Sequence, residues 1–194
     1  MKTAFIVISS ILAIVNILPY IRDVYLKKTK PRIVSWFTWS LLTAIASAAS
    51  FSDRQYASAI LTLLASMETL TVVILGWRYG DRKFAPFDIG CQIAAIIGLM
   101  LWLVFNSPAI AIIASICIDI IATLPTLKHS WEKPHEETAI TFLLGSVAAV
   151  FTVMAANSHK ITAVAFPAYL VVGNLLIAAI IYGRQAGKSC WWAK

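Results

Sequence analysis

The chain has 194 residues and a net charge of +7, with 60% hydrophobic and only 13% charged residues. Soluble domains average about 45–50% apolar and about 25% charged residues, so this composition excludes an ordinary water-soluble domain. The positive charge alone would suggest nucleic-acid binding. The basic residues lie in short loops between apolar runs, however, and we therefore expect no nucleic-acid partner.

Seven apolar runs follow one another, each about as long as a helix needs to be to cross a bilayer. They cover 4–22, 33–51, 56–77, 87–105, 108–127, 138–156 and 161–182. A backbone in lipid must satisfy its own hydrogen bonds, which favours helices. The sequence therefore predicts an all-α membrane protein of seven transmembrane helices. No Ala-x-Ala cleavage pattern follows the first run, which we interpret as a retained helix and not as a signal peptide.

The distribution of Lys and Arg predicts the orientation in the membrane. If the N-terminus lies outside, 13 of the 16 basic residues fall on the cytoplasmic side, and only Lys2, Arg54 and Lys160 lie outside. This asymmetry follows the positive-inside rule and predicts a cytoplasmic C-terminus. The chain carries no N-glycosylation sequon, which fits a bacterial membrane protein. We therefore expect this protein in a bacterial inner membrane.

The runs before and after the fourth one resemble each other. At an offset of 103 residues Pro31 aligns with Pro134, and Trp39 aligns with Phe142. Because a single linker helix reverses the direction of the chain, two repeated units would share one orientation. We predict two parallel three-helix bundles joined by a linker helix (3+1+3). The boundaries are 1–80 for the first bundle, 81–106 for the linker helix, 107–184 for the second bundle and 185–194 for a cytoplasmic tail.

Two prolines mark equivalent places in the predicted units. Pro19-Tyr20 and Pro125-Thr126 lie near the ends of the first and fifth helices, each close to a basic stretch. Together with the 3+1+3 order and the outside N-terminus, this pattern resembles the SWEET and PQ-loop superfamily of transporters. The dipeptides differ from the Pro-Gln of that family, and helices two and six lack the prolines that SWEETs carry there. The resemblance implies a transporter that moves a small polar solute by alternating access.

The superfamily leaves several alternatives open. The solute is a sugar, an amino acid or a nucleoside-like vitamin, and proton coupling is undecided. A second possibility is a receptor or sorting protein like the KDEL receptors, although the middles of most helices carry no Lys or Arg to capture a carboxylate. The pattern shows no metal cluster and no nucleophile with a base, so we expect no enzyme activity, no cofactor and no metal. A homo-oligomer remains open.

The same prolines predict hinges. Proline lacks the N–H that a helix interior needs, so Pro19 and Pro125 are expected to kink their helices, and family analogy makes them hinges. A static kink is the alternative. Asn16 lies one turn before Pro19, where it is expected to bond a freed carbonyl group or to face the pore.

Two carboxylates lie well away from the ends of the predicted helices. Glu68 is near the middle of 56–77, and Asp119 is six residues before Pro125. A carboxylate at bilayer depth costs about 2.5–3.5 kcal/mol on insertion scales, so by default it marks a functional site. We expect Glu68 to bind substrate or hold a transported proton, and Asp119 to couple a proton as in the PQ-loop amino-acid exporters. For each, a structural tie between helices is the alternative.

The other candidate substrate-binding residues follow from the family pattern. Asn174 lies in helix seven, where SWEETs place a substrate-binding asparagine, and its repeat partner is Thr71. Tyr169 is five residues before Asn174 and is expected to line the same cavity. Trp36 and Trp39 share one face of the second helix. We expect Trp39 to stack on the solute and Trp36 to anchor the helix at the interface.

The remaining polar residues are expected near the membrane surface. Glu136 and Glu137 follow Pro134, and carboxylates in the first turn of a helix suit its dipole. His129, His135 and His159 lie between the predicted helices and are interpreted as solvated loop residues.

Overall fold

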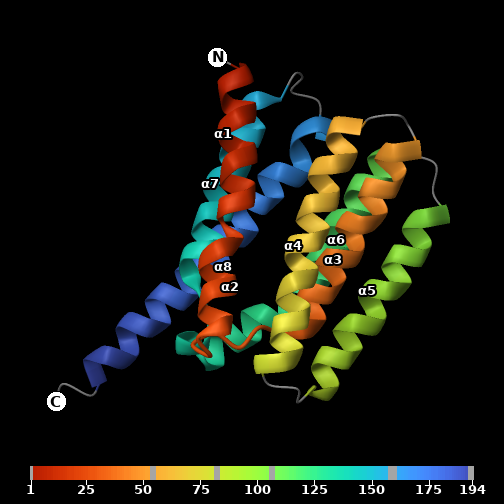
Figure 1. Cartoon of the computed structure of the whole chain (residues 1–194). Helices are drawn as coiled ribbons and strands as arrows, with labels where there is room; N and C mark the ends of the chain where they lie inside the picture. The colour runs from red at the N-terminus through yellow and green to blue at the C-terminus, as the bar shows by residue number, and fades with distance from the viewer. Residues whose placement is uncertain (1, 53–55, 81–83, 105–107, 157–160, 192–194) are drawn as a thin grey trace.

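The computed structural model describes residues 2–52, 56–80, 84–104, 108–156 and 161–191. This part of the chain is entirely helical and contains no strand, which confirms the all-α prediction (Figure 1). Its α-helices are α1 (Lys2–Val15), α2 (Ile17–Tyr25), α3 (Ile33–Ser52), α4 (Tyr56–Tyr79), α5 (Pro86–Val104), α6 (Pro108–Glu132), α7 (Ala139–Ala155) and α8 (Ile161–Trp191), and a 3₁₀ turn, η1 (Pro134–Glu136), precedes α7.

Each predicted apolar run coincides with a helix, the first run with α1 and α2 together. Among the described residues, Thr3–Tyr25 and Val164–Ala186 are long and apolar enough to cross a membrane by length and composition. Shorter apolar helices cover Ile33–Ala48, Pro86–Met100 and Ala139–Ala155. The helical class is therefore established, and the number of membrane spans stays a prediction.

The prolines act differently in different helices. α1 ends at Val15 and α2 begins after Asn16, because Pro19 has no N–H to bond the carbonyl group of Val15. Pro125 and Pro167, by contrast, lie inside α6 and α8, which continue through them. The helical hydrogen bonding is thus broken near Pro19 but continues through Pro125, and the predicted hinges stay predictions.

Two helices are longer than the apolar runs. α6 continues beyond its apolar run and ends at Glu132. It ends there because the residue before a proline, here Lys133 before Pro134, is disfavoured in the helical conformation. α8 continues through Gly183, which costs a helix only about 1 kcal/mol relative to alanine. The predicted tail, 185–194, is therefore helical as far as Trp191, and residues 192–194 lie outside the described part.

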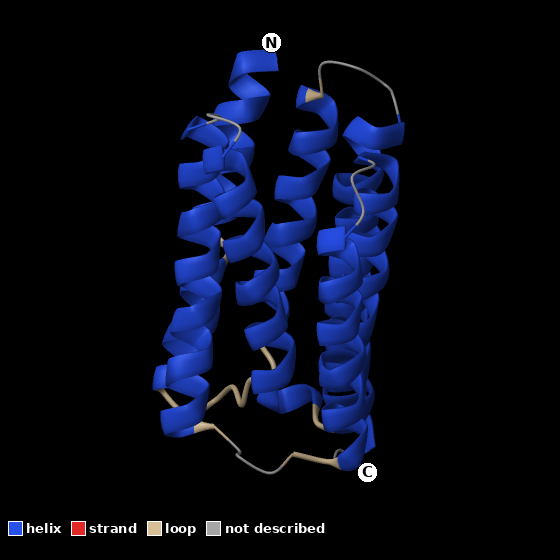
Figure 2. Ribbon diagram, turned by 90° about the vertical axis from the view of Figure 1, so that its right-hand side faces the viewer, coloured by secondary structure: helices blue, strands red, loops and turns tan. Residues whose placement is uncertain are grey.

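Helices from the two halves of the sequence are interleaved. α1 packs along α7, and α5 packs against α6 and α3. α4 lies against both α2 and α3, while α8 lies against both α6 and α7. The helices run side by side along the length of the molecule (Figure 2). α5 approaches α6 closely at Gly98, where a Cβ atom would come within 2.7 Å of Ile118 Cγ1.

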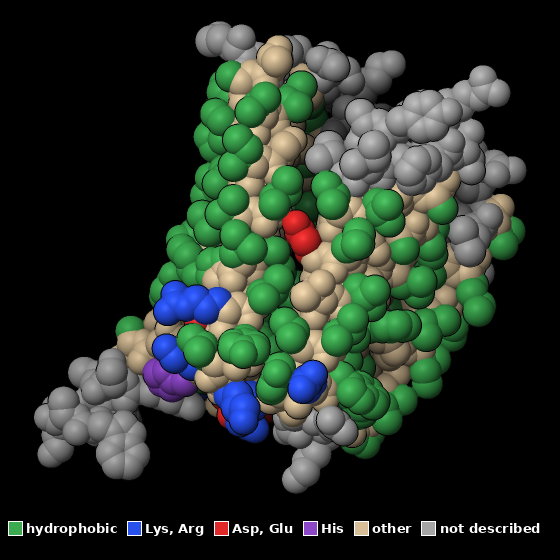
Figure 3. All heavy atoms as spheres, in the orientation of Figure 1, with side chains coloured by type: hydrophobic (Ala, Val, Ile, Leu, Met, Phe, Trp, Pro, Cys, Tyr) green, Lys and Arg blue, Asp and Glu red, His purple; other side chains and the backbone are tan. Residues whose placement is uncertain are grey.

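The outer surface is apolar. Figure 3 shows hydrophobic side chains covering most of the described surface of one face, with Lys and Arg side chains gathered at its lower end. Exposed large hydrophobic residues lie on every long helix; examples are Ile11, Ile74, Ile97, Ile113, Met154 and Val172. Soluble monomers rarely expose apolar patches beyond a few hundred Å².

A central cavity and the polar network that closes it

A cavity of about 740 Å³ lies between the helices. Among the described residues, all the long helices except α5 contribute to its lining. This volume falls within the range of about 300–1,000 Å³ that is typical of small-molecule sites. The cavity brings together five predicted site residues, Trp39, Glu68, Asp119, Tyr169 and Asn174.

Thr71 does not join this group. Its side chain is exposed, and its hydroxyl group donates to the Met67 carbonyl oxygen of its own helix, at 2.7 Å. The repeat alignment with Asn174 placed it at a comparable depth, but that alignment could not determine which face of α4 turns toward the cavity.

Asp119 is held by hydrogen bonds from α8 and from its own helix. The Tyr169 hydroxyl group on α8 donates to Asp119 Oδ2 at 2.7 Å, and Thr123 lies 3.5 Å from the same oxygen. Trp39 on α3 lines the same cavity. Asp119 itself is only 8% exposed. The carboxylate therefore ties α6 and α8 together at the cavity wall.

Glu68 has a different environment. It is half-buried and lines the cavity from α4. No hydrogen bond or ion pair joins it to any residue that the structure describes. Its carboxyl group is thus open to the cavity, without a fixed partner in that part of the chain.

Two asparagines approach the cavity from either side of α7. A Cβ atom on Gly145 would lie 3.5 Å from Asn174 Cγ and 3.6 Å from Asn16 Nδ2. Asn16 is the residue between α1 and α2, and Asn174 donates to the Leu170 carbonyl oxygen of α8 at 3.0 Å. The absence of a side chain at position 145 leaves the space between the two amide groups open.

The floor of the cavity is part of the main hydrophobic core. Ile17, Trp36, Phe142 and Ile177 line the cavity and also belong to the buried core cluster. Behind them lies Tyr20, whose ring centroid is 4.6 Å from that of Trp36 and 6.1 Å from that of Phe142.

The prediction that Trp36 anchors the helix at the membrane interface is wrong. Trp36 is 3% exposed, and its indole N–H donates to the Tyr20 hydroxyl group at 3.2 Å. A buried indole needs an acceptor, and Tyr20 on α2 supplies it. The two aromatic rings therefore form a core contact between α2 and α3.

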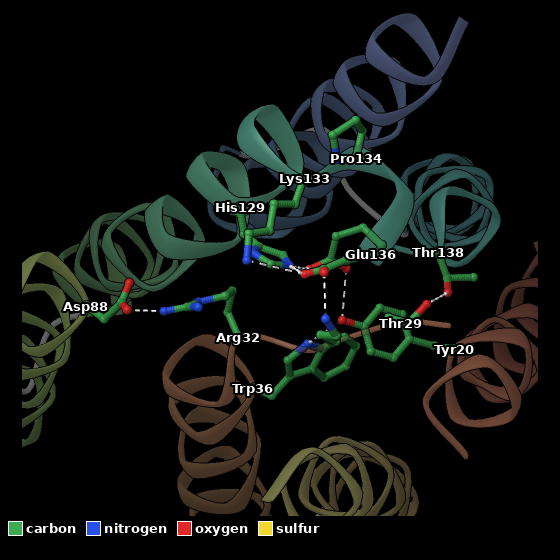
Figure 4. A network of polar contacts seen from close by, with 12 residues as sticks. Tyr20, Thr29, Arg32, Trp36, Asp88, His129, Lys133, Pro134, Glu136 and Thr138 are labelled. Carbon is green, nitrogen blue, oxygen red and sulfur yellow. Dashed lines mark hydrogen bonds and ion pairs between the residues drawn. The ribbon is translucent and has the colours of Figure 1, made fainter. Parts of the chain in front are cut away.

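Beneath this floor, polar contacts join segments that are far apart in the sequence (Figure 4). Tyr20 donates to Glu137 Oε2 at 2.9 Å, and the Thr138 hydroxyl group donates to Asp23 Oδ2 at 3.1 Å. Lys30 bonds Glu136 twice, from Nζ to Oε1 at 2.6 Å and from its backbone N–H to the carbonyl oxygen at 2.8 Å. We call this set the polar network; it also includes Thr29, Arg32, Asp88, His129 and Lys133.

Glu136 and Glu137 do not lie in the first turn of α7, where the sequence suggested that they would suit the helix dipole. Glu136 ends η1, and α7 begins only at Ala139. Glu137 has an extended backbone and is 4% exposed. This conformation turns its carboxyl group inward to Tyr20, so a hydrogen bond to a distant segment takes the place of an interaction with the dipole of α7.

The Glu137 carboxyl group resists ionisation. Burial raises the pKa of Glu137 to about 8, although the Tyr20 hydrogen bond and the Arg32 charge both lower it. Glu136 behaves oppositely. Burial raises its pKa, but the Lys30 hydrogen bond and the Lys133 charge outweigh that effect and hold the pKa below its usual value.

His129 is not a solvated loop residue. It lies on the C-terminal part of α6 and is 6% exposed. Burial, assisted by the charge of Arg32, lowers the pKa of His129 to about 4. Its Nε2 atom lies 3.6 Å from Glu136 and 4.0 Å from Glu137, but a neutral imidazole makes these contacts weaker than ion pairs. His135 is exposed, as expected, and His159 lies outside the described residues.

The polar network was missed by sequence reasoning. Most of its residues come from two loops and the helix ends beside them, and Asp88 comes from α5; the basic residues of these loops had been interpreted as markers of orientation. One signal was present: Glu136 and Glu137 form an acidic pair within a basic loop. The positive charges of Lys30 and Arg32 come from the other loop, and only the tertiary structure brings the two together.

No protein-family model, curated protein or solved structure matches this chain. The cavity and the polar network are therefore the basis for assigning a function.

Proposed function

We propose that this protein is a membrane transporter of seven spanning helices that moves a small polar solute by alternating access. The observation that carries the proposal is a cavity of ligand size, with a lining contributed by both halves of the chain and a polar network that adjoins it through the bond from Trp36 to Tyr20. Concave sites between helices with a few convergent polar groups are the usual form of small-molecule sites.

The apolar exterior supports a membrane location. Large hydrophobic side chains are exposed on every long helix, and water would make such a surface unfavourable. In a bilayer the same surface faces acyl chains. The gathering of Lys and Arg at one end of the face in Figure 3 is consistent with a cytoplasmic end, an outside N-terminus and a bacterial inner membrane.

Helix packing supports the 3+1+3 arrangement. In each proposed unit, 1–80 and 107–184, the third helix packs against both the first and the second. α5 would then be the linker helix. This common packing order is what two copies of one unit would have, and it supports the proposed internal repeat.

The polar network supplies a gate between the units. Tyr20–Glu137, Lys30–Glu136 and Thr29–Thr138 each join 1–80 to 107–184. One such hydrogen bond contributes only about 0.5–1.5 kcal/mol, so the closed state can be reversed by a ligand that binds the open state more tightly. Pro19 and Pro125 are the proposed hinges.

The cavity residues have distinct proposed roles. Asn174, Trp39 and Tyr169 contact the solute, and Glu68 binds the solute or a proton. Asp119 is the second candidate for proton coupling, in addition to its role as a tie between helices. A carboxylate-capturing receptor is less well supported, because the described lining contains no Lys, Arg or His.

Solute flux tests this proposal. Labelled sugars, amino acids, nucleosides and small amines would be offered to proteoliposomes that contain the full chain. Gly145→Leu places a side chain between Asn16 and Asn174 and should abolish uptake. Gly90→Leu is the matched control, because a Cβ atom at Gly90 meets nothing within 4 Å.

Saturable uptake that is lost in Gly145→Leu and kept in Gly90→Leu would support a carrier with this cavity as its pathway. The proposal fails if wild-type vesicles carry no solute of any of these classes. It also fails if Gly145→Leu transports as well as the wild type. Size-exclusion elution and the melting temperature of each variant show whether the protein is folded.

A further inference from the structure

The lining of the cavity carries negative but no positive side chains. Glu68 and Asp119 are its acidic members, and no Lys, Arg or His occurs among the described lining residues. Three of the described basic residues, Lys30, Arg32 and Lys133, belong instead to the polar network, where they pair with Asp88 and Glu136. The solute site therefore has no complement for an anion.

The two carboxylates differ in the hydrogen-bond donors that surround them. Asp119 accepts hydrogen bonds from Tyr169 and Thr123, both of them neutral donors. Glu68 has no donor at all among the described residues. A carboxylate away from water requires a counter-charge or a proton, because burying an unpaired charge is costly. A cationic solute would supply that charge at Glu68.

The rest of the lining fits an organic cation better than a metal ion. Five aromatic residues line the cavity: Trp36, Trp39, Phe142, Phe166 and Tyr169. Aromatic faces attract ammonium groups, by about 2 kcal/mol or more when the cation is desolvated. A metal ion would need several oxygen or nitrogen ligands close together, and the described residues contain no group of three or more His, Cys, Asp or Glu placed to hold one.

We infer that the solute is a small organic cation whose ammonium group lies against Glu68, with its apolar part against the aromatic lining. This inference rests on the proposed function, since it names the solute class for the same cavity. It also implies competition, because a proton and the cation neutralise the same carboxyl group. Entry of one favours release of the other, which is the requirement for exchange.

Among the described residues that line the cavity, Glu68 is the titratable group that we expect to pair with the solute. α4 packs against α1, α2 and α3, and none of these contributes a charged side chain to the described lining. The other titratable lining groups are Asp119 on α6 and Tyr169 on α8, which are bonded to each other. A cation bound at Glu68 should therefore show a dissociation constant that rises with acidity, approaching about tenfold per pH unit.

Pairs of ligands that differ only in charge test the inference. Choline would be compared with 3,3-dimethylbutan-1-ol, and tryptamine with tryptophol, by thermal melting of the purified full chain at pH 7.5 and 5.5. At about 100 times its dissociation constant, a cation should raise Tm by about 5–10 °C, and its neutral counterpart by less than about 1 °C. The rise should shrink at pH 5.5.

Variants then locate the charge. Glu68→Gln should remove the preference for the cation while leaving the ligand-free Tm unchanged, and Glu68→Asp should keep it in weakened form. Glu132→Gln removes the same charge from an exposed position outside the cavity and should behave as the wild type. The inference is overturned if each neutral ligand stabilises as much as its cation, if no cation stabilises the protein, or if the preference survives Glu68→Gln.

Flux separates this inference from the proposed function. Uptake of a neutral solute that Gly145→Leu blocks would support the transporter function and would contradict the organic cation as the solute. Binding of a cation that depends on Glu68, without uptake of any solute, would support the cation site and would contradict the transporter function. Uptake of a cation that requires both Gly145 and Glu68 would support both.

Discussion

The cavity and the polar network lie next to each other, share Trp36 as a boundary and use the same kinds of residues in opposite ways. In the network, Glu137 and Glu136 contact partners from distant segments, and little space remains between them. In the cavity, Glu68 faces open volume without a partner among the described residues. Buried polar groups that are paired hold elements together, whereas polar groups around space are available to a ligand.

Removing a carboxylate by mutation should therefore have different effects in the polar network and in the cavity. Removing a paired group leaves its partner buried and unsatisfied, so stability should fall. Removing a group that faces the cavity should leave stability unchanged and affect solute binding alone. Asp119 lies between these cases, because it lines the cavity and is also paired.

The largest expected effect is at Glu137. Glu137→Ala removes the acceptor of the Tyr20 hydroxyl group and opens a void beside it, so we expect a loss of about 3 kcal/mol in the free energy of unfolding. This corresponds to a fall in Tm of about 6–12 °C for a chain of this length. Glu68→Ala is the control and should lower Tm by less than about 2 °C. Equal losses in the two variants would contradict the comparison.

The pH dependence of stability comes next. The folded protein holds a proton on Glu137 more tightly than the unfolded chain does, since the pKa is raised from 4.5 to about 8. That contribution is complete below about pH 4.5 and is lost as pH rises toward 8. For His129 the pKa is lowered from 6.5 to about 4, so its contribution is present above 6.5 and is lost as pH falls toward 4.

The two contributions oppose each other between pH 4.5 and 6.5, and only that of Glu137 remains above 6.5. We expect a nearly flat profile followed by a loss of about 1.5 kcal/mol from pH 6.5 to 8, measured by denaturant or thermal unfolding. Glu137→Gln should remove the alkaline decline and expose an increase from pH 4.5 to 6.5. A decline that persists in this variant would rule out Glu137 as its source.

The Asp119–Tyr169 pair should show a smaller coupling. Interhelical hydrogen bonds in membrane proteins contribute about 0.6 kcal/mol on average and about 1.7 kcal/mol at most. A double-mutant cycle with Asp119→Asn and Tyr169→Phe should therefore give about 1 kcal/mol. The same cycle with Glu68→Gln in place of Asp119→Asn should give none. Coupling at Glu68 of similar size would mean that it too is a structural tie.

The smallest effect is expected at Lys30. Its side chain is 40% exposed and pairs with Glu136 at 2.6 Å, and partly exposed ion pairs contribute about 0.2–1 kcal/mol. Lys30→Met should lower the free energy of unfolding by about 0.5 kcal/mol, because the backbone bond from Lys30 to Glu136 remains. The loss should shrink in 1 M salt. A loss as large as that of Glu137→Ala would show that the exposed Lys30–Glu136 pair contributes as much to stability as the buried Tyr20–Glu137 bond.

The sequence by itself determined the helices. Continuous apolar runs predicted the helix positions well, because chain length and proline chemistry act locally. It also identified Glu68 and Asp119, since carboxylates inside apolar runs are conspicuous, whereas Asn174 was singled out only through the resemblance to SWEETs. Pro19 marked a real interruption for the same local reason.

Only the tertiary structure decided how these residues are used. Thr71 and Asn174 align in the repeat, yet Thr71 is exposed and Asn174 lines the cavity, because helix rotation depends on neighbouring helices. Glu137 and Tyr20 are 117 residues apart in the sequence, and nothing local predicts that they meet. Burial determines whether a carboxyl group is ionised, paired or open to a solute, and burial is a property of the whole packed chain.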